Sequence, residues 1–172
     1  MAECHRVFVG LGSNIEPERN LREAVRLLAE RCRLLSASPV YQTRPVGTVD
    51  QPDFCNAAAL IETNLSAAAL KTQVLADIEQ ALHRVRTSDK NAPRTIDLDI
   101  VLFGSEILDL GHRHIPDPDL LTYPHVAIPV SDLAPQFVHP ETGQTLQEIV
   151  HGMDLAGLRL RPEINLWQPP QE

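Results

Sequence analysis

The sequence predicts an α+β domain in which strands and helices follow one another in the order β-α-β-β-α-β. Two observations lead to this prediction. Short runs rich in valine, isoleucine and leucine end at glycine or asparagine, as strands commonly do. Two longer segments carry apolar residues at the spacing of a helix. All of these features precede Ser105 in the chain of 172 residues.

The first strand and the first helix are expected near the N-terminus. "HRVFVGLGSN" begins with an apolar run and ends in two glycines, which is typical of a strand that leads into a turn. In "PERNLREAVRLLAERCRLL", Leu21, Ala24, Val25 and Leu28 fall at offsets of 0, 3, 4 and 7, and Pro17 suits a first helical turn. The pattern predicts an amphipathic helix.

The middle of the chain supplies the remaining elements. "LLSASPVYQT" is predicted to be extended and is followed by a loop, "RPVGTVDQPD". A strand is expected in "FCNAAALIETN", and Ser66 is a candidate N-cap for a second helix in "SAAALKTQVLADIEQALHRV". After a polar loop, "RTIDLDIVLFG" is predicted to be the last strand. The apolar stripe of the second helix consists of Leu70, Val74, Ile78, Leu82 and Val85.

These elements favour one particular arrangement. Two helices on one face of a mainly antiparallel four-stranded sheet would bury both stripes, which is the ferredoxin-like sandwich. From Ser105 onward the chain is rich in proline ("IPDPDLLTYPHVAIP") and is expected to wrap around the core, with a short helix near "TLQEIVHGM". The last residues, "NLWQPPQE", look like a tail. We therefore expect a single domain over residues 1–160 with its proline-rich extension, and a C-terminal tail over 161–172.

Composition limits the classes of partner. The chain has 23 acidic residues against 15 lysines and arginines, a net charge of -8, which argues against a nucleic-acid binder but allows a local basic pocket for a small anion. No apolar run is long enough to span a membrane, and the N-terminus has no secretion-signal pattern. Cys4, Cys32 and Cys55 show no CxxC spacing and are expected to be reduced. We expect a cytoplasmic protein that is a monomer.

Two aspartates in the last predicted strand are the first candidates for a functional site. Side chains alternate along a strand, so Asp97 and Asp99 share one face while Ile96, Leu98 and Ile100 share the other. The aspartate Cα atoms would lie about 6.5–7 Å apart. Two carboxylates at that range favour a cation between them, and Mg²⁺ accepts one or two carboxylates together with phosphate oxygens. A solvated face whose acids discourage edge pairing explains the spacing equally well.

Cations cluster just before these aspartates. "HRVRTSDKNAPR" places Arg84, Arg86, Lys90 and Arg94 within eleven positions of a chain that is acidic elsewhere. Cations that offset the dipole at a helix C-terminus would account for the first two alone. Together with the arginine at the strand entrance and the two aspartates, the cluster favours phosphate binding, because guanidinium groups bind phosphate in a fork. The segment therefore predicts a nucleotide–magnesium site.

The same residues resemble a known family. "APRTIDLDIVLFG" is similar to the signature of the 6-hydroxymethyl-7,8-dihydropterin pyrophosphokinases of folate biosynthesis. "VFVGLGSNIEPERNL", "SPVYQTRPVGTVDQPDFCNAAALIET" and "DLAPQFVHPETGQTLQEIV" also resemble segments of this family, so the likeness covers most of residues 6–150. It implies an ATP-dependent enzyme that transfers pyrophosphate to the hydroxymethyl group of the pterin and leaves AMP.

The resemblance also implies residue roles for the chemistry. Asp97 and Asp99 match the family's magnesium-binding aspartates, and two ions would bridge the triphosphate and the attacking hydroxyl. Arg94 matches the signature arginine that contacts phosphate. Arg84 and Arg86 match the family's paired arginines, which we include among the catalytic and nucleotide-binding residues.

Ligand-binding residues follow from the same resemblance. Glu79 matches an acidic residue of the nucleotide site, to which Ile100 is also assigned. Asn56 matches the residue whose amide contacts the polar edge of the pterin, and Phe54 stands where a tyrosine usually stacks on the ring. The implied pterin pocket consists of Thr43, Pro45, Val46, Phe54, Asn56 and His125.

The C-terminal ligand-facing segment departs from the family pattern. Asp117 replaces a histidine, while Tyr123 and His125 stand where an arginine and an aromatic residue are usual. Losing a cation and gaining an acid beside a triphosphate should weaken ATP binding unless another base substitutes. Basic residues near this segment are His112, Arg113 and His114.

Three functions therefore remain open. The first is the pyrophosphokinase reaction on 6-hydroxymethyl-7,8-dihydropterin. The second is the same chemistry with a modified pterin or another nucleotide. The third is a non-catalytic pterin- or nucleotide-binding protein, which the intact pair of aspartates disfavours.

Overall fold

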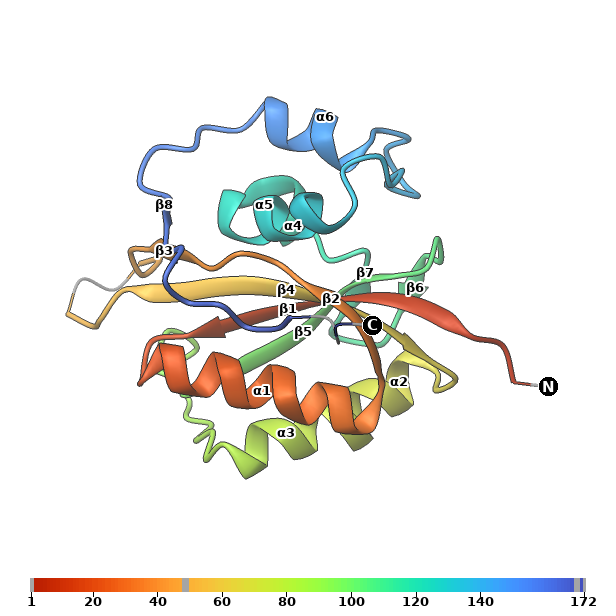
Figure 1. The fold of residues 1–172 in the computed structure, drawn as a ribbon. Helices are drawn as coiled ribbons and strands as arrows, with labels where there is room; N and C mark the ends of the chain where they lie inside the picture. The colour runs from red at the N-terminus through yellow and green to blue at the C-terminus, as the bar shows by residue number, and fades with distance from the viewer. Residues whose placement is uncertain (1, 48–49, 169–170, 172) are drawn as a thin grey trace.

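The computed structural model describes residues 2–47, 50–168 and 171, and it contains a six-stranded sheet with helices on both faces (Figure 1). The strand order is β5-β1-β4-β3-β8, with β2 also paired to β4, and every pair is antiparallel. The expected mixed class with an antiparallel sheet is confirmed. The strands are β1 (His5–Ser13), β2 (Arg33–Ala37), β3 (Tyr41–Thr43), β4 (Phe54–Thr63), β5 (Asp97–Phe103) and β8 (Arg159–Leu160).

Two helical segments cover the first face, which we call the α1 face. Helix α1 (Pro17–Arg31) begins at the predicted proline. The second segment comprises α2 (Ala67–Ala69), the π-helix η1 (Leu70–Leu75) and α3 (Ala76–Ala81). The predicted N-cap is confirmed, because the Ser66 hydroxyl accepts a hydrogen bond from the backbone N–H of Ala69.

The C-terminal end of this second segment differs from the prediction. The helix ends at Ala81, and Val85, which was expected to continue its stripe, is 71% exposed. His83 adopts a left-handed conformation (φ 62°) and its N–H donates to Gln80, while the N–H of Arg84 donates to Glu79. These two bonds form a Schellman motif, which stops a helix and reverses the chain. The reversal directs Arg84 toward the start of β5.

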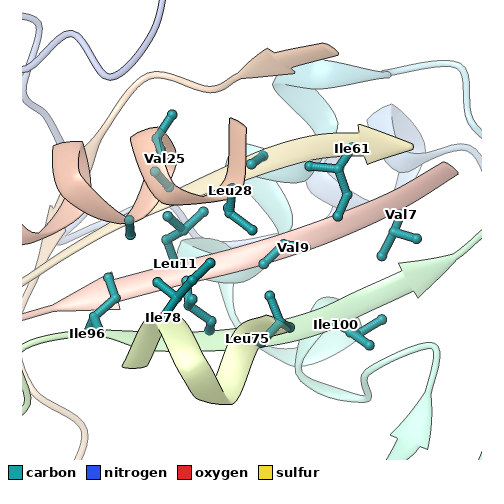
Figure 2. Packing of buried hydrophobic residues seen from close by; sticks show 14 of the residues in the cluster. Val7, Val9, Leu11, Val25, Leu28, Ile61, Leu75, Ile78, Ile96 and Ile100 are labelled. Carbon is teal, nitrogen blue, oxygen red and sulfur yellow. The ribbon is translucent and has the colours of Figure 1, made fainter. Parts of the chain in front are cut away.

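The main core lies between the sheet and the α1 face (Figure 2). Val9 and Leu11 of β1, with Ile100 of β5, point toward Leu28 of α1 and Leu75 of η1. Alternation along the strands explains this layer, since every second side chain of β1 and β5 faces the helices. The residues between them face the opposite side of the sheet.

The opposite face, which we call the α5 face, is covered by the proline-rich third of the chain (Figure 1). Helix α5 (Pro124–Leu133) packs on the sheet, preceded by α4 (Asp119–Thr122), and α6 (Leu146–His151) packs on α5. The expected helix near "TLQEIVHGM" is confirmed as α6. The sequence predicted that this segment wraps around the core, but it did not predict helix α5.

The prolines of α5 explain the difference. Pro124 occupies the first turn, where a missing N–H costs nothing, and Pro129 removes a single backbone hydrogen bond. Burial of Ala127 and Val130 against Phe8 and the rest of the second apolar cluster favours the helix despite that loss. A short hairpin of β6 (Leu108–Asp109) and β7 (His114–Ile115) joins β5 to this layer.

The C-terminal segment contacts the core. Strand β8 pairs with β3, and the N–H of Arg161 donates to the carbonyl of Val40. Within residues 161–172, which were expected to be a tail, Ile164 and Leu166 are buried in the main cluster. Their spacing of two along an extended chain places both side chains on the same side.

The structure also bears on the state of the cysteines and on membrane-spanning helices. Cys4 is exposed, Cys32 is half-buried and Cys55 is buried, and all three are free. Burial raises the pKa of the Cys55 thiol, which disfavours the reactive thiolate. Among the helices of the described residues, none has the length and apolar character needed to cross a membrane.

The contribution of the C-terminal segment to stability can be measured directly. Ile164→Ala should lower the free energy of unfolding by about 2–5 kcal/mol, because the side chain is 3% exposed within the core. Leu155→Ala, at a position that is 46% exposed, is the matched control and should change stability by less than about 0.5 kcal/mol. Urea unfolding of both variants tests this, and equal effects would contradict the packing of residue 164.

Candidate functional site

The floor of the candidate site is formed by β1 on the α5 face. In the register of the sheet, Gly12 lies opposite Asp97 of β5 on one side and opposite Asn56 of β4 on the other. Gly10 lies opposite Asp99 in the same way. A Cβ atom at position 12 would lie 3.5 Å from Oδ1 of Asn56. The two glycines therefore keep the sheet surface between the aspartates and the amide free of side chains.

One cavity, which we call cavity A, opens above this floor. It has a volume of about 260 Å³ and lies between β1, β4 and the N-terminal end of α5. The Nδ2 of Asn56 donates to Thr43 Oγ1 at 3.0 Å, which fixes the orientation of the amide. Cavity A is lined by Gly12, Thr43, Arg44, Val46, Gln51, Phe54, Asn56, Lys90, Asn91, Arg94, Asp97, Asp119, Tyr123 and His125.

Aromatic rings stand on the walls of cavity A. The rings of Tyr123 and His125 stack with centroids 5.2 Å apart at an interplanar angle of 30°. Burial lowers the pKa of His125, so its imidazole is neutral at pH 7 and presents an uncharged ring face. The guanidinium carbon of Arg94 lies 5.7 Å from the centre of the Phe54 ring, within cation–π range. This cavity suits a flat ligand with a polar edge.

A second cavity, cavity B, adjoins the first and is acidic. Its volume is about 120 Å³, and it shares Gly12, Asn56, Asp97, Asp119 and His125 with cavity A. Four carboxylates line it: Asp97, Asp99, Asp117 and Asp119.

A third cavity, cavity C, is basic and has a volume of about 670 Å³. It shares Lys90, Arg94 and Asp97 with cavity A, so the two cavities meet at one carboxylate. Cavity C is lined by Lys71, Thr72, Ala76, Arg84, Val85, Arg86, Thr87, Asp89, Lys90, Ala92, Pro93, Arg94, Asp97, His112 and Arg113. Seven basic side chains against two acidic ones make it suited to an anion.

Asp97 lies where these cavities meet and is held by two arginines. Its Oδ2 lies 3.1 Å from Nη1 of Arg94, and its Oδ1 lies 3.8 Å from Nη2 of Arg84. Burial raises the pKa of Asp97, and the neighbouring Asp99 carboxylate raises it further, while the arginines oppose both effects. A carboxylate whose charge is destabilised in this way favours a bound cation.

Asp99 is held by two other cations. Its Oδ1 lies 2.6 Å from Nη2 of Arg113 and 3.2 Å from Nζ of Lys71, which also donates to the carbonyl of Leu98 at 2.6 Å. Arg113 sits in the turn of the β6–β7 hairpin and also lies 3.9 Å from Asp117. Both cations reach the site from elements distant in sequence.

Hydrogen bonds of the backbone set the positions of Arg84 and Arg94. The Schellman motif at the end of α3 turns Arg84 inward, where its Nη1 donates to the carbonyl of Ile96 at 3.3 Å. Two hydrogen bonds to Asn14 fix the backbone of Arg94. The backbone N–H of Arg94 donates to Oδ1 of Asn14 at 2.8 Å, and the backbone N–H of Asn14 donates to the carbonyl of Arg94 at 3.1 Å. Gln51 then joins Asn14 to Asn91.

Several buried polar atoms have no partner among the described residues. They are Oε2 of Glu79, Nε of Arg84 and Oγ1 of Thr95. Glu79 is nearly inaccessible to solvent, burial raises its pKa, and its Oε1 accepts from Arg86 at 3.0 Å. A buried group without a partner costs free energy, which a bound ligand can offset. Nε of Arg84 is a free donor beside cavity C.

The predicted site residues are distributed unequally over these cavities. Asp97, Asp99 and the arginines at 84, 86 and 94 lie around cavities B and C. The predicted pterin residues Thr43, Val46, Phe54, Asn56 and His125 all line cavity A, as does Tyr123.

Three predicted residues line none of these cavities. Glu79 is one of them, and it contacts Arg86 of cavity C from a buried position. Pro45 is half-buried next to cavity A but is not among the residues that line it. Ile100 belongs to the main core on the α1 face (Figure 2). It faces away from Asp99 because side chains alternate along β5.

Sequence patterns did not identify two cations of the site. Lys71 falls within the polar stripe of the second helix, where a lysine is unremarkable, and no motif links it to Asp99, which is 28 residues away. Arg113 was considered only as a nearby base. Gly12 and Asn14 also contribute, and "GSN" at a strand end is the one local signal that could have indicated a site.

The protein supplies few ligands for a metal. In the part of the chain that is described, no group of three or more histidine, cysteine, aspartate or glutamate side chains is arranged to hold an ion. Two adjacent carboxylates suit Mg²⁺, which is commonly held by one or two carboxylates with waters and substrate phosphates in the remaining positions. The donor set therefore fits Mg²⁺ delivered with a polyphosphate rather than a closed structural metal site.

Asp117 gives this region a measurable pH dependence. Burial raises the pKa of Asp117 to about 6, above its unfolded value of about 4. Because the folded state binds the proton more tightly, ionisation costs stability as the pH rises between these values. Asp117→Asn should therefore gain stability relative to the unmodified chain between about pH 4 and pH 7. Urea unfolding across this range tests it, and a difference that does not change with pH would contradict it.

Comparisons with known proteins identify one family. The family profile described as "7,8-dihydro-6-hydroxymethylpterin-pyrophosphokinase (HPPK)" matches residues 8–135. The chain is similar to two proteins named 2-amino-4-hydroxy-6-hydroxymethyldihydropteridine pyrophosphokinase. The Pseudomonas aeruginosa protein is 38% identical over 160 residues, covering 91% of this chain and 97% of the relative. The Synechocystis protein is 36% identical over 160 residues, covering 88% and 78%.

A solved structure supports the fold. A crystal structure of Plasmodium falciparum HPPK-DHPS with pteroate aligns with a TM-score of 0.67 at 13% identity, covering 87% of this chain and 42% of that one. At 13% sequence identity, this alignment shows that the two chains share a fold. With a family profile that matches residues 8–135 and two relatives matched over 97% and 78% of their own length, this chain belongs to the 7,8-dihydro-6-hydroxymethylpterin-pyrophosphokinase (HPPK) family.

Proposed function

We propose that the chain transfers pyrophosphate from ATP to the hydroxymethyl group of 6-hydroxymethyl-7,8-dihydropterin, giving the pterin diphosphate and AMP, in folate biosynthesis. The names of its relatives support this reaction. The observation that carries the proposal is the position of Asp97, which lines cavities A, B and C at once. A flat pocket and a basic cavity that meet at one carboxylate suit a reaction between a ring substituent and a polyphosphate.

Cavity A is the proposed pterin pocket. Phe54 would stack on the ring from one wall, with Tyr123 and His125 on another. Asn56, oriented by Thr43, would hydrogen-bond to the polar edge of the pterin. Val46 supplies apolar contact, and Pro45 supports the backbone beside it. The hydroxymethyl group would then extend toward Asp97.

Cavity C is the proposed ATP site. Arg84, Arg86 and Arg94 would bind the phosphates, and the free Nε of Arg84 is a donor suited to a phosphate oxygen. The unpartnered Oε2 of Glu79 would accept a hydrogen bond from a nucleotide hydroxyl or amino group. Ile100, which lies in the core, would act only by supporting β5 beneath the site.

Asp97 and Asp99 would hold two Mg²⁺ ions together with the triphosphate. When bound, these ions supply Lewis-acid stabilisation of the charge that develops on the phosphoryl oxygens. The hydroxymethyl oxygen would attack the β-phosphorus and lose its proton to solvent. The bond from the β-phosphorus to the oxygen that bridges the α- and β-phosphates would break, and AMP would leave with that oxygen. Arg84 and Arg94 orient the phosphates for in-line attack and offset their charge.

The remaining properties follow from the same proposal. The strand order β5-β1-β4 followed by β2 and β3 supports a ferredoxin-like sandwich with a proline-rich extension, in one domain to which residues 161–168 also contribute contacts. The net charge of -8 supports small molecules rather than nucleic acid as partners. We propose a cytoplasmic monomer, in agreement with three unpaired cysteines.

The metal role of the two aspartates predicts a selective loss of turnover. Asp97→Asn and Asp99→Asn should each reduce AMP formation from ATP and 6-hydroxymethyl-7,8-dihydropterin by at least about a hundredfold. Affinity for 6-hydroxymethylpterin, measured by calorimetry, should change little, because cavity A remains intact. Asp77→Asn, which alters an exposed carboxylate of α3, is the matched control. Normal AMP formation in either site variant would refute the metal role.

The stacking role of Phe54 predicts a loss of pterin affinity. Phe54→Ala should weaken binding of 6-hydroxymethylpterin about tenfold, since stacking of a base on an aromatic ring contributes about 1–3 kcal/mol. Phe54→Tyr keeps the ring and should retain affinity. Calorimetry with the pterin alone tests both variants. Equal pterin affinity in the alanine variant and the unmodified chain would exclude cavity A as the pterin pocket.

A further inference from the structure

The environment of Asp99 contains more positive charge than the carboxylate requires. Nζ of Lys71 and Nη2 of Arg113 both contact the same oxygen, Oδ1, at 3.2 and 2.6 Å. One cation is enough to neutralise a carboxylate. A second cation on the same oxygen is therefore positioned for a further anion in addition to Asp99.

The charge balance around the two aspartates also favours a further anion. Four cations lie within 4 Å of Asp97 and Asp99, namely Lys71, Arg84, Arg94 and Arg113. Within the residues that the structure describes, the one further carboxylate in contact with any of them is Asp117, 3.9 Å from Arg113. Among the described residues the cluster thus keeps a positive excess in a partly buried setting, where electrostatic attraction is stronger than in water.

The two cations on Asp99 also stand on the wall of cavity C. Lys71 and Arg113 both line it, together with the arginines that contact Asp97. Their side chains are 24% and 43% exposed, so each reaches both the carboxylate and the cavity. Arg113 lies in a hairpin turn beside Gly111, and Lys71 has a long flexible chain. Both side chains can turn from Asp99 to a ligand by rotation alone.

We propose that Lys71 and Arg113 are phosphate-binding residues of the nucleotide site, acting on the Asp99 side of cavity C as Arg84 and Arg94 act on the Asp97 side. The proposal rests on the proposed function, which supplies a nucleotide as the ligand of this cavity. With a divalent cation held by Asp99, Lys71 and Arg113 would leave Oδ1 of the carboxylate. Both would then contact phosphate oxygens of the same nucleotide.

The test is nucleotide binding rather than turnover. The probe is α,β-methylene-ATP with Mg²⁺, an analogue whose bridging carbon prevents cleavage between the α- and β-phosphates, and affinity is measured by calorimetry. Arg113→Ala and Lys71→Ala should each weaken binding about tenfold, as expected for loss of one charge-assisted contact to phosphate. Arg113→Lys keeps the charge without the fork and should fall between. Arg159→Ala, an exposed arginine of β8, is the matched control and should bind normally.

A second measurement separates ligand binding from a merely structural role. Binding of Mn²⁺ alone, followed by electron paramagnetic resonance, should be at least as tight in Arg113→Ala as in the unmodified chain, because a competitor for Asp99 has been removed. Weaker Mn²⁺ binding would mean that Arg113 only holds Asp99 in place, and would overturn the proposal. Unchanged affinity for the nucleotide analogue in both alanine variants would also overturn it. Neither result depends on AMP formation, so the proposed function is tested separately.

Discussion

The site depends on the alternation of side chains along an edge strand. Ile96, Leu98 and Ile100 are buried on the α1 face, and this burial forces Asp97 and Asp99 onto the α5 face side by side. A shift of one residue in the register with β1 would exchange the two sets and bury both carboxylates. The free energy of burying the apolar side chains of β5 therefore fixes which face of the strand carries the two aspartates.

The edge position of β5 determines which groups can reach these carboxylates. In the part of the chain that the structure describes, β5 pairs with a strand on one side only, namely β1. Lys71 comes from the helical layer on the α1 face, and Arg113 comes from the hairpin that follows β5. In the middle of a sheet, a neighbouring strand would exclude both. On the inner side, Gly10 and Gly12 leave the sheet surface open toward Asn56. Cavities A and C can thus meet at Asp97.

Much of this architecture follows from the sequence. The helical stripe after Pro17, the N-cap at Ser66 and the shared face of Asp97 and Asp99 all come from local patterns, and the structure has each of them. Local patterns succeed where burial and backbone preference agree. The match of Phe54 and Asn56 to a pocket came from family resemblance, since neither residue has a local signature of its own.

The remaining features depend on interactions distant in sequence. Helix α5 contains Pro129, and only packing on the sheet makes a helix favourable there. The end of α3 depends on a left-handed His83, a conformation that sequence reasoning assigns to glycine first. Burial of Ile164 and the contacts of Lys71 and Arg113 with Asp99 link segments that no local pattern joins.

One measurement tests the central claim most directly. A crystal structure of the chain with Mg²⁺, α,β-methylene-ATP and 6-hydroxymethylpterin should show oxygens of Asp97 and Asp99 about 2.0–2.1 Å from metal ions that also contact the triphosphate. The cations now paired with the aspartates should then lie against phosphate oxygens. A complex in which the triphosphate is bound while both aspartates keep their present ion pairs, with no metal between them, would contradict the account.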